Sequence, residues 1–324
     1  MHGTIVGVLR GGPSKEHDVS LKSGHSMLAS LPREHFTVRD IYIDRSGTWH
    51  DRGKPSTPGQ ILPTIDMAII CIHGAYGQDG EVQKILDLFG VPYTGPDAYH
   101  AFHASHKVMA KEVARKAGVR TPRYLFAETS EQAEAMAQEA VRSFHQPVVV
   151  KPVDSGSSVG VSVVGGYKTV LDAILALFAD GARGVMVEER IRGREATVGI
   201  VDGLRGEVLY ALPPVEIVPP EEHDYFSYEA KYSGKSEEIC PGRFTRKESD
   251  ELIHLARTMH SALNQTHYSR SDFIVSDKGI YFLETNTAAA VGMTAESLMP
   301  KALASVGVTL PDFAAHLVGQ TLRA

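Results

Sequence analysis

The chain has 324 residues, of which 43% are hydrophobic and 22% are charged, and its net charge is −6 at pH 7. These values are typical of a soluble globular protein with room for two or three domains. The negative balance argues against a nucleic-acid partner, and we find no apolar run of the about 18 residues that a membrane span requires.

The N-terminus and the cysteines indicate the compartment. Residues 1–10 lack the basic start and long apolar stretch of a signal peptide, and they predict a first β-strand instead. Cys71 and Cys240 lie far apart without the spacing of metal ligands, which favours free thiols in a reducing environment. We therefore expect a cytoplasmic protein.

The N-terminal part alternates between strand and helix patterns. Strands are predicted at residues 4–9, 36–43 and 67–72, and helices at 18–30 and 80–88. Such alternation indicates a parallel sheet covered by helices, with ligands at the carboxyl ends of its strands. Glu16 and His73 fall at those ends, so residues 1–97 are predicted to be a parallel α/β domain with a ligand site.

A central unit is predicted over residues 98–184. It contains a helix at 105–117 capped by Ser105, a helix at 130–141, a buried strand at 147–151, and a strand at 161–164. The glycine-rich turn at 156–160 could bind phosphate through its N–H groups, although a plain hairpin turn is the commoner explanation. Lys151 is equally consistent with a solvated lysine or a phosphate ligand. Lys107 lies in the first helical turn, where a cation is unfavourable unless an anion compensates.

The C-terminal unit, residues 185–324, has predicted strands at 185–188 and 195–201, a helix at 246–263 and a hairpin at 268–286. The polar excursion at 219–241 exceeds ordinary loop lengths and is a candidate lid. Glu188 and Glu195 are either surface carboxylates or partners for a nucleoside.

The hairpin is the most informative segment. Two apolar runs flank residues 277–279, which predicts a three-residue loop with Gly279 in the left-handed conformation. That register pairs Asp272 with Glu284 and Arg270 with Asn286 on one face. Two carboxylates and an amide oxygen suit Mg²⁺, and the arginine beside them suits phosphate. The alternative is a polar end of a surface hairpin, and a shift of one residue in register would split the set.

Two common nucleotide motifs are missing from the sequence. The chain lacks a Gly-Lys-Ser/Thr phosphate loop, and its first glycines do not match the dinucleotide fingerprint. A nicotinamide-dependent enzyme is therefore not expected.

Several ordered motifs together carry a family resemblance. They lie at residues 11–20 (GGPSKEHDVS), 73–80, 92–95, 151–160, 193–198, 228–232, 270–272 and 284–287. The chain resembles the D-alanine–D-alanine ligase family of the ATP-grasp superfamily over essentially its full length. The resemblance implies a three-domain architecture of class α/β, with α+β character in the ATP-binding part, and a cytoplasmic homodimer that serves peptidoglycan synthesis.

The resemblance also implies a reaction and its residues. ATP would lie between the central and C-terminal sheets, and an acyl phosphate of one D-alanine would be captured by the amine of a second. The residues implied for ATP are Lys107, Lys151, Ser158, Glu188, Glu189, Ile191, Glu195 and Lys231. Those implied for two Mg²⁺ ions, for which Mn²⁺ is expected to substitute, are Asp272, Glu284 and Asn286. Those implied for catalysis and substrate are Glu16, His73, Ser157, Tyr232, Arg270, Gly292, Ser297 and Leu298.

Two departures from the family pattern stand out. After Asn286 the chain has Thr-Ala-Ala-Ala-Val-Gly292, which is longer than the family's stretch and lacks its proline. Since proline restricts the backbone, we expect a looser loop and a permissive acceptor site. Ser269 replaces a glycine that is frequent in the family.

Two other functions remain open. The first is an ATP-grasp carboxylate–amine ligase with another D-amino acid or D-hydroxy acid as acceptor, although the Tyr228–Tyr232 lid resembles the dipeptide-forming branch. The second is an ATP-binding regulatory module without chemistry. Such a module usually loses metal ligands or the arginine, whereas Arg270, Asp272, Glu284 and Asn286 are all present.

Overall fold

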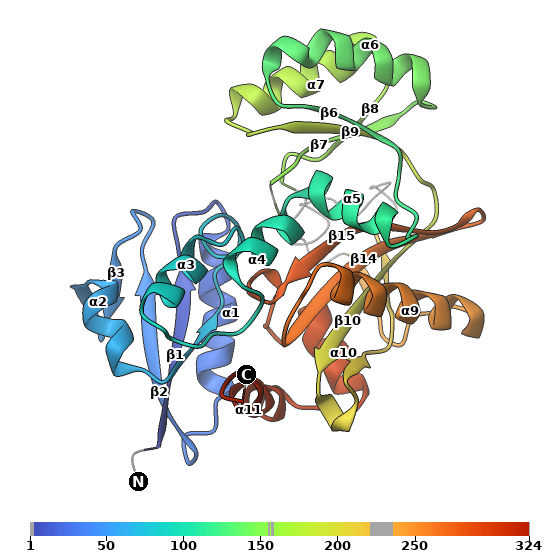
Figure 1. Cartoon of the computed structure of the whole chain (residues 1–324). Coiled ribbons are helices and arrows are strands. Elements are labelled where there is room, and N and C mark those ends of the chain that lie inside the picture. The colour runs from blue at the N-terminus through green and yellow to red at the C-terminus, as the bar shows by residue number, and fades with distance from the viewer. Residues whose placement is uncertain (1–2, 155, 157–158, 221–235, 324) are drawn as a thin grey trace.

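The computed structural model describes residues 3–154, 156, 159–220 and 236–323. They form three sheets with helices packed between and around them (Figure 1). Two of the predicted catalytic residues, Ser157 and Tyr232, and two of the predicted ATP ligands, Ser158 and Lys231, lie outside the described residues.

The N-terminal sheet has five strands in the order β4-β3-β2-β1-β5. Its elements are β1 (Thr4–Gly11), α1 (His17–Ser30), β2 (Phe36–Ile43), β3 (Trp49–Asp51), β4 (Lys54–Ser56), α2 (Pro58–Ile61), η1 (Leu62–Thr64), β5 (Met67–Ile70) and α3 (Glu81–Leu88). β1 pairs in parallel with β2 and β5, as predicted. β3 and β4 add antiparallel pairs at one edge, so the sheet is mixed rather than purely parallel. Short strands joined by tight turns can only pair in this antiparallel way.

The central sheet has four strands in the order β6-β9-β7-β8, and all of its pairs are antiparallel. Its elements are β6 (Tyr124–Ala127), η2 (Ser130–Gln132), α6 (Ala133–Ser143), β7 (Val148–Pro152), β8 (Ser162–Val164), α7 (Tyr167–Ala179) and β9 (Val185–Glu189). α6 and α7 cover the outer face (Figure 1). The division at residue 184 stays a prediction, but β9 pairs with β6 and β7, which argues for a border after Glu189.

The C-terminal sheet follows the order β13-β12-β10-β14-β15, and β11 pairs with β10. Its elements are β10 (Arg194–Asp202), η3 (Leu204–Gly206), β11 (Leu209–Ala211), β12 (Val215–Val218), β13 (Glu237–Ile239), α9 (Arg246–Ala262), β14 (Tyr268–Ser276), β15 (Gly279–Thr287), η4 (Ala288–Ala290), α10 (Leu298–Ser305) and α11 (Leu310–Thr321). α9 begins with a capping box in which Thr245 and Glu248 bond each other's backbone.

Two helices connect the N-terminal sheet to the central one. They are α4 (Ala98–Ser105) and α5 (Lys107–Lys116), and both pack on β15. The predicted Ser105 cap is wrong: Ser105 ends α4 by donating to the carbonyl of Phe102, while His106 caps α5 by accepting from the N–H of Met109. The sequence pattern missed α4, because its apolar face is made mainly of alanines.

The hairpin of β14 and β15 has the two predicted pairs of its polar face, but not the predicted turn or the pairs next to it, since Ile274 faces Tyr281 instead of Phe282. Ser276 pairs with Gly279, so the loop has two residues rather than three. A shift in register between Asp272 and Phe273 then restores the offset, and Asp272 faces Glu284 while Arg270 faces Asn286. A β-bulge of this kind adds one residue to one strand and re-aims the side chains beyond it.

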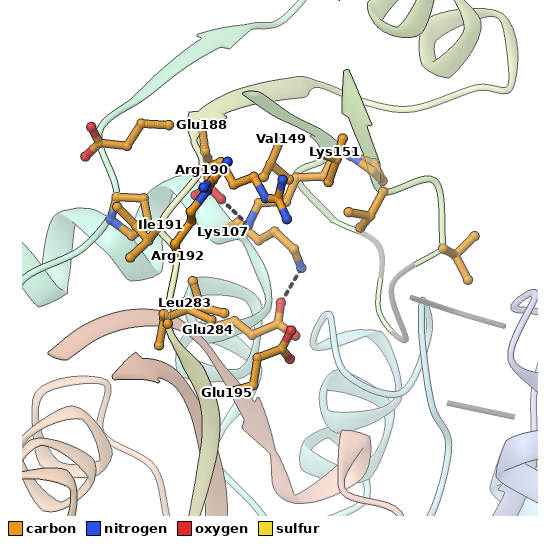
Figure 2. A pocket seen from close by; sticks show the side chains of 18 residues that line it. Lys107, Val149, Lys151, Glu188, Arg190, Ile191, Arg192, Glu195, Leu283 and Glu284 are labelled. Carbon is orange, nitrogen blue, oxygen red and sulfur yellow. Dashed lines mark ion pairs between the residues drawn. The ribbon is translucent and has the colours of Figure 1, made fainter. Parts of the chain in front are cut away.

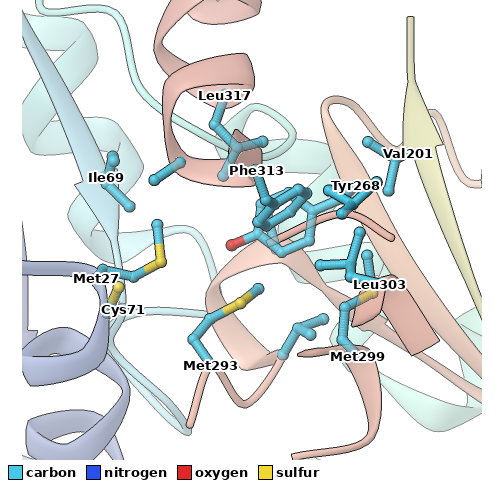
Figure 3. Close-up of a cluster of buried hydrophobic side chains, with 14 of the residues drawn as sticks. Met27, Ile69, Cys71, Val201, Tyr268, Met293, Met299, Leu303, Phe313 and Leu317 are labelled. Atoms are coloured by element: carbon cyan, nitrogen blue, oxygen red, sulfur yellow. The ribbon is translucent and has the colours of Figure 1, made fainter. Parts of the chain in front are cut away.

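One hydrophobic core joins the N-terminal and C-terminal sheets. Met27 of α1, Ile69 of β5 and Cys71 just after β5 belong to it, and α11 inserts Phe313 against Tyr268 with the ring centroids 5.3 Å apart (Figure 3). The central sheet has a separate core, whose members all lie between residues 125 and 187 in the described part of the chain. Apolar packing therefore divides the protein into two bodies.

The alanine segment after Asn286 is not a loose loop. Ala288 and Ala289 are 1% and 3% exposed, and they belong to the cores on either side of the N-terminal sheet. The residues form η4, closed by a bond from the N–H of Val291 to the carbonyl of Ala288. The expectation of a looser segment is wrong, because burial of the small side chains fixes the backbone without proline.

Among the described residues, no single helix is long and apolar enough to cross a membrane. Only α10 and α11, separated by a 99° bend, meet that requirement when taken together.

Phe313→Ala should lower the free energy of unfolding by about 3–5 kcal/mol, because it opens a cavity in the core that joins two sheets. Leu322→Ala is the control, since Leu322 is 44% exposed, and it should change stability by less than about 0.5 kcal/mol. Denaturant titration measures both. Equal losses in the two variants would contradict the packing described for α11.

Candidate active site

A cavity of about 300 Å³ lies between the central sheet and the C-terminal hairpin. Val149, Val161 and Val163 form one apolar wall, and Ile274 and Leu283 form the opposite one. Charged side chains gather at its end, as Figure 2 shows for Lys107, Lys151, Glu188, Glu195 and Glu284. A flat apolar ring fits between such walls, and anionic groups fit beside the lysines.

The structure brings most of the predicted ATP residues into this one cavity. Those that line it are Lys107, Lys151, Glu188, Glu189, Ile191 and Glu195. Lys107 begins α5, and its ammonium lies 2.7 Å from a carboxylate oxygen of Glu284 on β15. The anion that the helix position of Lys107 required is therefore present, and Glu284 holds the pKa of the buried lysine above its ordinary value despite desolvation.

Glu188 is the centre of a buried cluster of charges. Its two carboxylate oxygens lie 2.6 Å from Lys111 and 2.5 Å from Lys151. Burial alone would raise the pKa of Glu188, but the two lysines lower it below its usual range. Burial lowers the pKa of Lys111 to about 8, although Glu188 opposes that shift. Glu188 is therefore an ionised carboxylate held by two cations, not a surface side chain.

Lys111 was missed by the sequence analysis. It is fully buried, and it also donates to Thr121 at 2.7 Å. The signal was available, because Lys111 lies four residues after Lys107 on the same helix and such residues share a face. Arg190 and Arg192, which line the cavity, were missed as well; an arginine-rich turn after a strand is too common to point to a site.

The polar face of the hairpin lies beside the lysines. Asp272 accepts bonds from Thr197 at 2.5 Å, from Nδ2 of Asn286 at 3.0 Å and from Nε of Arg270 at 3.1 Å. Burial lowers the pKa of Arg270, but Asp272 more than compensates and the pKa lies above its ordinary value. The carboxylate and amide groups of Asp272, Glu284 and Asn286 thus converge as predicted. Thr197, which orients Asp272, was not predicted.

The N-terminal sheet presents Glu16 and His73 to the same region. Glu16 is 8% exposed, and a Cβ placed on Gly156 would come within 2.9 Å of its carboxylate, so glycine permits the close approach of the backbone at residue 156. His73 is buried, and desolvation together with the charge of Arg270 lowers its pKa to about 4. His73 is therefore neutral at physiological pH.

The residues predicted for the oxyanion and the second substrate lie together after η4. A Cβ on Gly292 would come within 2.8 Å of the hydroxyl of Ser297, and Ser297 precedes α10, which begins at Leu298. Ser297 also bonds Thr294 through both its hydroxyl and its amide. The arrangement is compact, which does not support the permissive acceptor site expected from the missing proline.

Comparison with known proteins agrees with this geometry. The family model described as "D-ala D-ala ligase C-terminus" matches residues 113–319, and "D-ala D-ala ligase N-terminus" matches residues 5–61. A D-alanine–D-alanine ligase of Geobacter sulfurreducens is 37% identical over 97% of this chain and 93% of its own length. The chain belongs to the D-alanine–D-alanine ligase family. That result confirms the family, the ligase class and the ATP-grasp fold predicted from the sequence.

Solved structures of the family superpose over the whole chain. The D-alanyl-alanine synthetase A of Vibrio cholerae has a TM-score of 0.86 at 27% identity and covers 100% of both chains. The D-alanine–D-alanine ligase of Bacillus anthracis complexed with ATP has a TM-score of 0.80 at 25% identity, covering 99% and 98%. The VanG D-Ala:D-Ser ligase of Enterococcus faecalis also has a TM-score of 0.86, at 25% identity, covering 99% and 100%.

Lys111→Met should lower the free energy of unfolding by about 3–5 kcal/mol, because it leaves Glu188 buried with one cation fewer. The double variant Lys111→Met/Glu188→Gln should recover a large part of that loss. Lys116→Met is the control, since Lys116 is exposed on the same helix, and it should stay within about 0.5 kcal/mol of the parent. Additive effects in the double-mutant cycle, measured by denaturant titration, would show that the two charges do not interact.

Proposed function

We propose that the protein joins two D-alanines into D-alanyl-D-alanine with hydrolysis of ATP to ADP and phosphate, for peptidoglycan precursors. The observation that carries the proposal is the convergence of three parts on one site, in a chain of this family. These parts are the lysine-rich cavity, the Asp272–Glu284–Asn286 face, and the buried pair Glu16 and His73.

In this proposal the adenine lies between the apolar walls, with Val149 on one side and Leu283 on the other. Glu188, Glu189 and the backbone around Ile191 would bond the base and Glu195 the ribose. Lys107 and Lys151 would bind phosphate oxygens, since both are buried cations within 3 Å of carboxylates that a phosphate can replace.

A metal site at Asp272, Glu284 and Asn286 fits the residues present. Their carboxylate and amide oxygens are donors that Mg²⁺ prefers, and Mn²⁺ accepts the same set. In the structure, Lys107 and Arg270 balance the carboxylates, which indicates a place where cations are needed. Two bound ions would neutralise the charge that develops on the phosphates during transfer.

The first D-alanine would bind with its ammonium at Glu16, while His73 and Arg270 face its carboxylate. The carboxylate attacks the γ-phosphorus, the bond to ADP breaks, and an acyl phosphate forms. The amine of the second D-alanine, whose carboxylate is bound by Ser297 and Leu298, then attacks the carbonyl and phosphate leaves. Arg270 and the N–H of Gly292 are the proposed donors to the tetrahedral oxyanion. Water must be excluded, because it would hydrolyse the acyl phosphate.

The proposed closing elements, Ser157, Ser158, Lys231 and Tyr232, lie outside the described residues. Their roles in binding phosphate and in joining Glu16 by hydrogen bonds stay predictions.

Release of phosphate, measured with and without D-alanine, tests the proposal. We expect ATP turnover to depend on D-alanine, and mass spectrometry to find one dipeptide per phosphate. Binding of ATP without any D-alanine-dependent turnover would instead favour the regulatory module.

A homodimer and a cytoplasmic location are proposed on the same resemblance. The large exposed apolar side chains Leu88, Phe89, Tyr99 and Phe102 lie on α3, just after it, and on α4, where a second copy could cover them. A light-scattering mass of one 35.2 kDa chain would contradict the dimer.

Glu284→Gln and Asp272→Asn should each abolish turnover at ordinary Mg²⁺ concentrations, because each removes a charge from the metal face. Glu251→Gln is the control, since Glu251 is exposed on α9, and it should keep full activity. Turnover measured across a Mg²⁺ titration checks this. Near-normal rates of both variants at low Mg²⁺ would show that the metal binds elsewhere.

The acceptor is the open part of the proposal, because a D-Ala:D-Ser ligase superposes as well as a D-alanyl-alanine synthetase. With equimolar D-alanine, D-serine and D-lactate at neutral pH, we expect D-alanyl-D-alanine to dominate, since the acceptor region is compact and the lid resembles the dipeptide branch. Mass spectrometry of the products measures the ratio. A dominant D-serine or D-lactate product would establish the alternative ligase instead.

A further inference from the structure

His73 is held on three sides by serines. The hydroxyl of Ser14 donates to the carbonyl of His73 at 2.7 Å, and the N–H of His73 donates to the hydroxyl of Ser20 at 2.8 Å. The hydroxyl of Ser23 lies 2.9 Å from Nε2 of the imidazole ring. We call Ser14, Ser20 and Ser23 the serine clamp.

The serine clamp also fixes Glu16. The N–H of Glu16 donates to Ser14 at 3.2 Å, and Ser20 donates to the carbonyl of Glu16 at 3.1 Å. Each of these two hydroxyls therefore donates one bond and accepts another between the same two residues. Glu16 follows β1 and His73 follows β5. The shared hydroxyls therefore fix the position of one residue relative to the other.

Ser23 differs from the other two serines, because it contacts the ring of His73 and not the backbone of His73. Ser23 is 1% exposed, and its oxygen accepts the N–H of Met293 at 3.4 Å, next to Gly292. A buried hydroxyl has a single proton, and leaving that proton without an acceptor is costly. Nε2 of His73 is the acceptor at hand, so the ring proton of the neutral imidazole belongs on Nδ1.

We propose that Ser23 is a positioning residue that holds His73 with its proton on Nδ1, so that His73 presents a neutral N–H donor toward the first substrate. In the described part of the chain, Nδ1 makes no hydrogen bond, which leaves it available to a ligand. The inference rests on the proposed function for the identity of that ligand, an amino acid carboxylate beside Arg270.

The arrangement has a chemical reason. Arg270 already supplies a permanent positive charge at this place, and its charge lowers the pKa of His73. A second cation would bind the carboxylate more tightly and make it a poorer nucleophile. A neutral donor orients the carboxylate instead, and the bond from Met293 to Ser23 joins this orientation to the backbone that carries the proposed oxyanion donor.

Nitrogen NMR of the full-length enzyme labelled with ¹⁵N-histidine tests the proposal directly. The signals of His73 are identified by their loss in His73→Gln. In the wild-type protein near neutral pH we expect Nδ1 to be of the protonated type and Nε2 of the unprotonated type. A proton on Nε2 would overturn the proposal. This readout needs no turnover, so it is independent of whether the proposed ligation is correct.

Ser23→Ala removes the donor to Nε2 and should let the proton redistribute between the two ring nitrogens. The KM for D-alanine should rise about three- to tenfold, as expected for one hydrogen bond, while the KM for ATP stays within about twofold. Ser23→Cys retains a weak donor and should be intermediate in both readouts.

Ser26→Ala is the matched control, on the same helix and with no hydrogen bond of its hydroxyl among the described residues. It should leave both the His73 signals and the KM values unchanged. If Ser23→Ala keeps the wild-type His73 signals, Ser23 does not set the tautomer. Equal rises in the KM for ATP and for D-alanine would show a general structural loss and would also overturn the positioning role.

Discussion

Buried charge is the constraint on which the arrangement of this protein depends. Lys107, Lys111, Lys151 and Glu188 are nearly inaccessible, and an isolated ion in such a place would cost several kcal/mol. Two of the ion pairs that prevent this cost start from α5 and reach two different sheets. Lys107 on α5 reaches Glu284 on β15, while Lys111 and Lys151 share Glu188 on β9. α5 therefore links the central sheet to the C-terminal hairpin through charge, while the Lys151–Glu188 pair lies within the central sheet.

Apolar packing acts elsewhere. The largest core joins the N-terminal and C-terminal sheets, whereas the core of the central sheet keeps to its own residues in the described part of the chain. An apolar interface is lost whenever the surfaces separate, but an ion pair can exchange one partner for another. The proposed nucleotide site is therefore lined by ion pairs of Lys107 and Lys151. A phosphate can replace the carboxylate partner of either lysine without leaving that lysine unpaired.

The sequence was sufficient for most elements and for the convergence of the site, but not for the details that local patterns do not encode. Alternation of apolar residues located β2 and the hairpin, and the residue types on one face of that hairpin indicated a hard cation. The turn and the pairs next to it were wrong, but the pairs of the polar face were right, because a bulge between Phe273 and Asp272 offset the shorter loop. A bulge leaves no sequence signal of its own. The capping residue of α5 and the assignment of β9 to the central sheet also required tertiary contacts.

The same distinction explains what was missed inside the site. Lys107 and Glu284 were found because a cation at a helix start and a carboxylate on a paired strand are each unusual. Lys111 and the serine clamp were not found, because a lysine and two serines on helices and a serine in a turn are ordinary until their partners are known. The alanines after Asn286 show the opposite error. The sequence indicated a flexible loop there, but Ala288 and Ala289 are only 1% and 3% exposed and belong to two cores. Small side chains let η4 lie close against Gly95 and the N-terminal sheet. The segment between the metal face and Gly292 is therefore fixed by packing on the same sheet that positions Glu16 and His73.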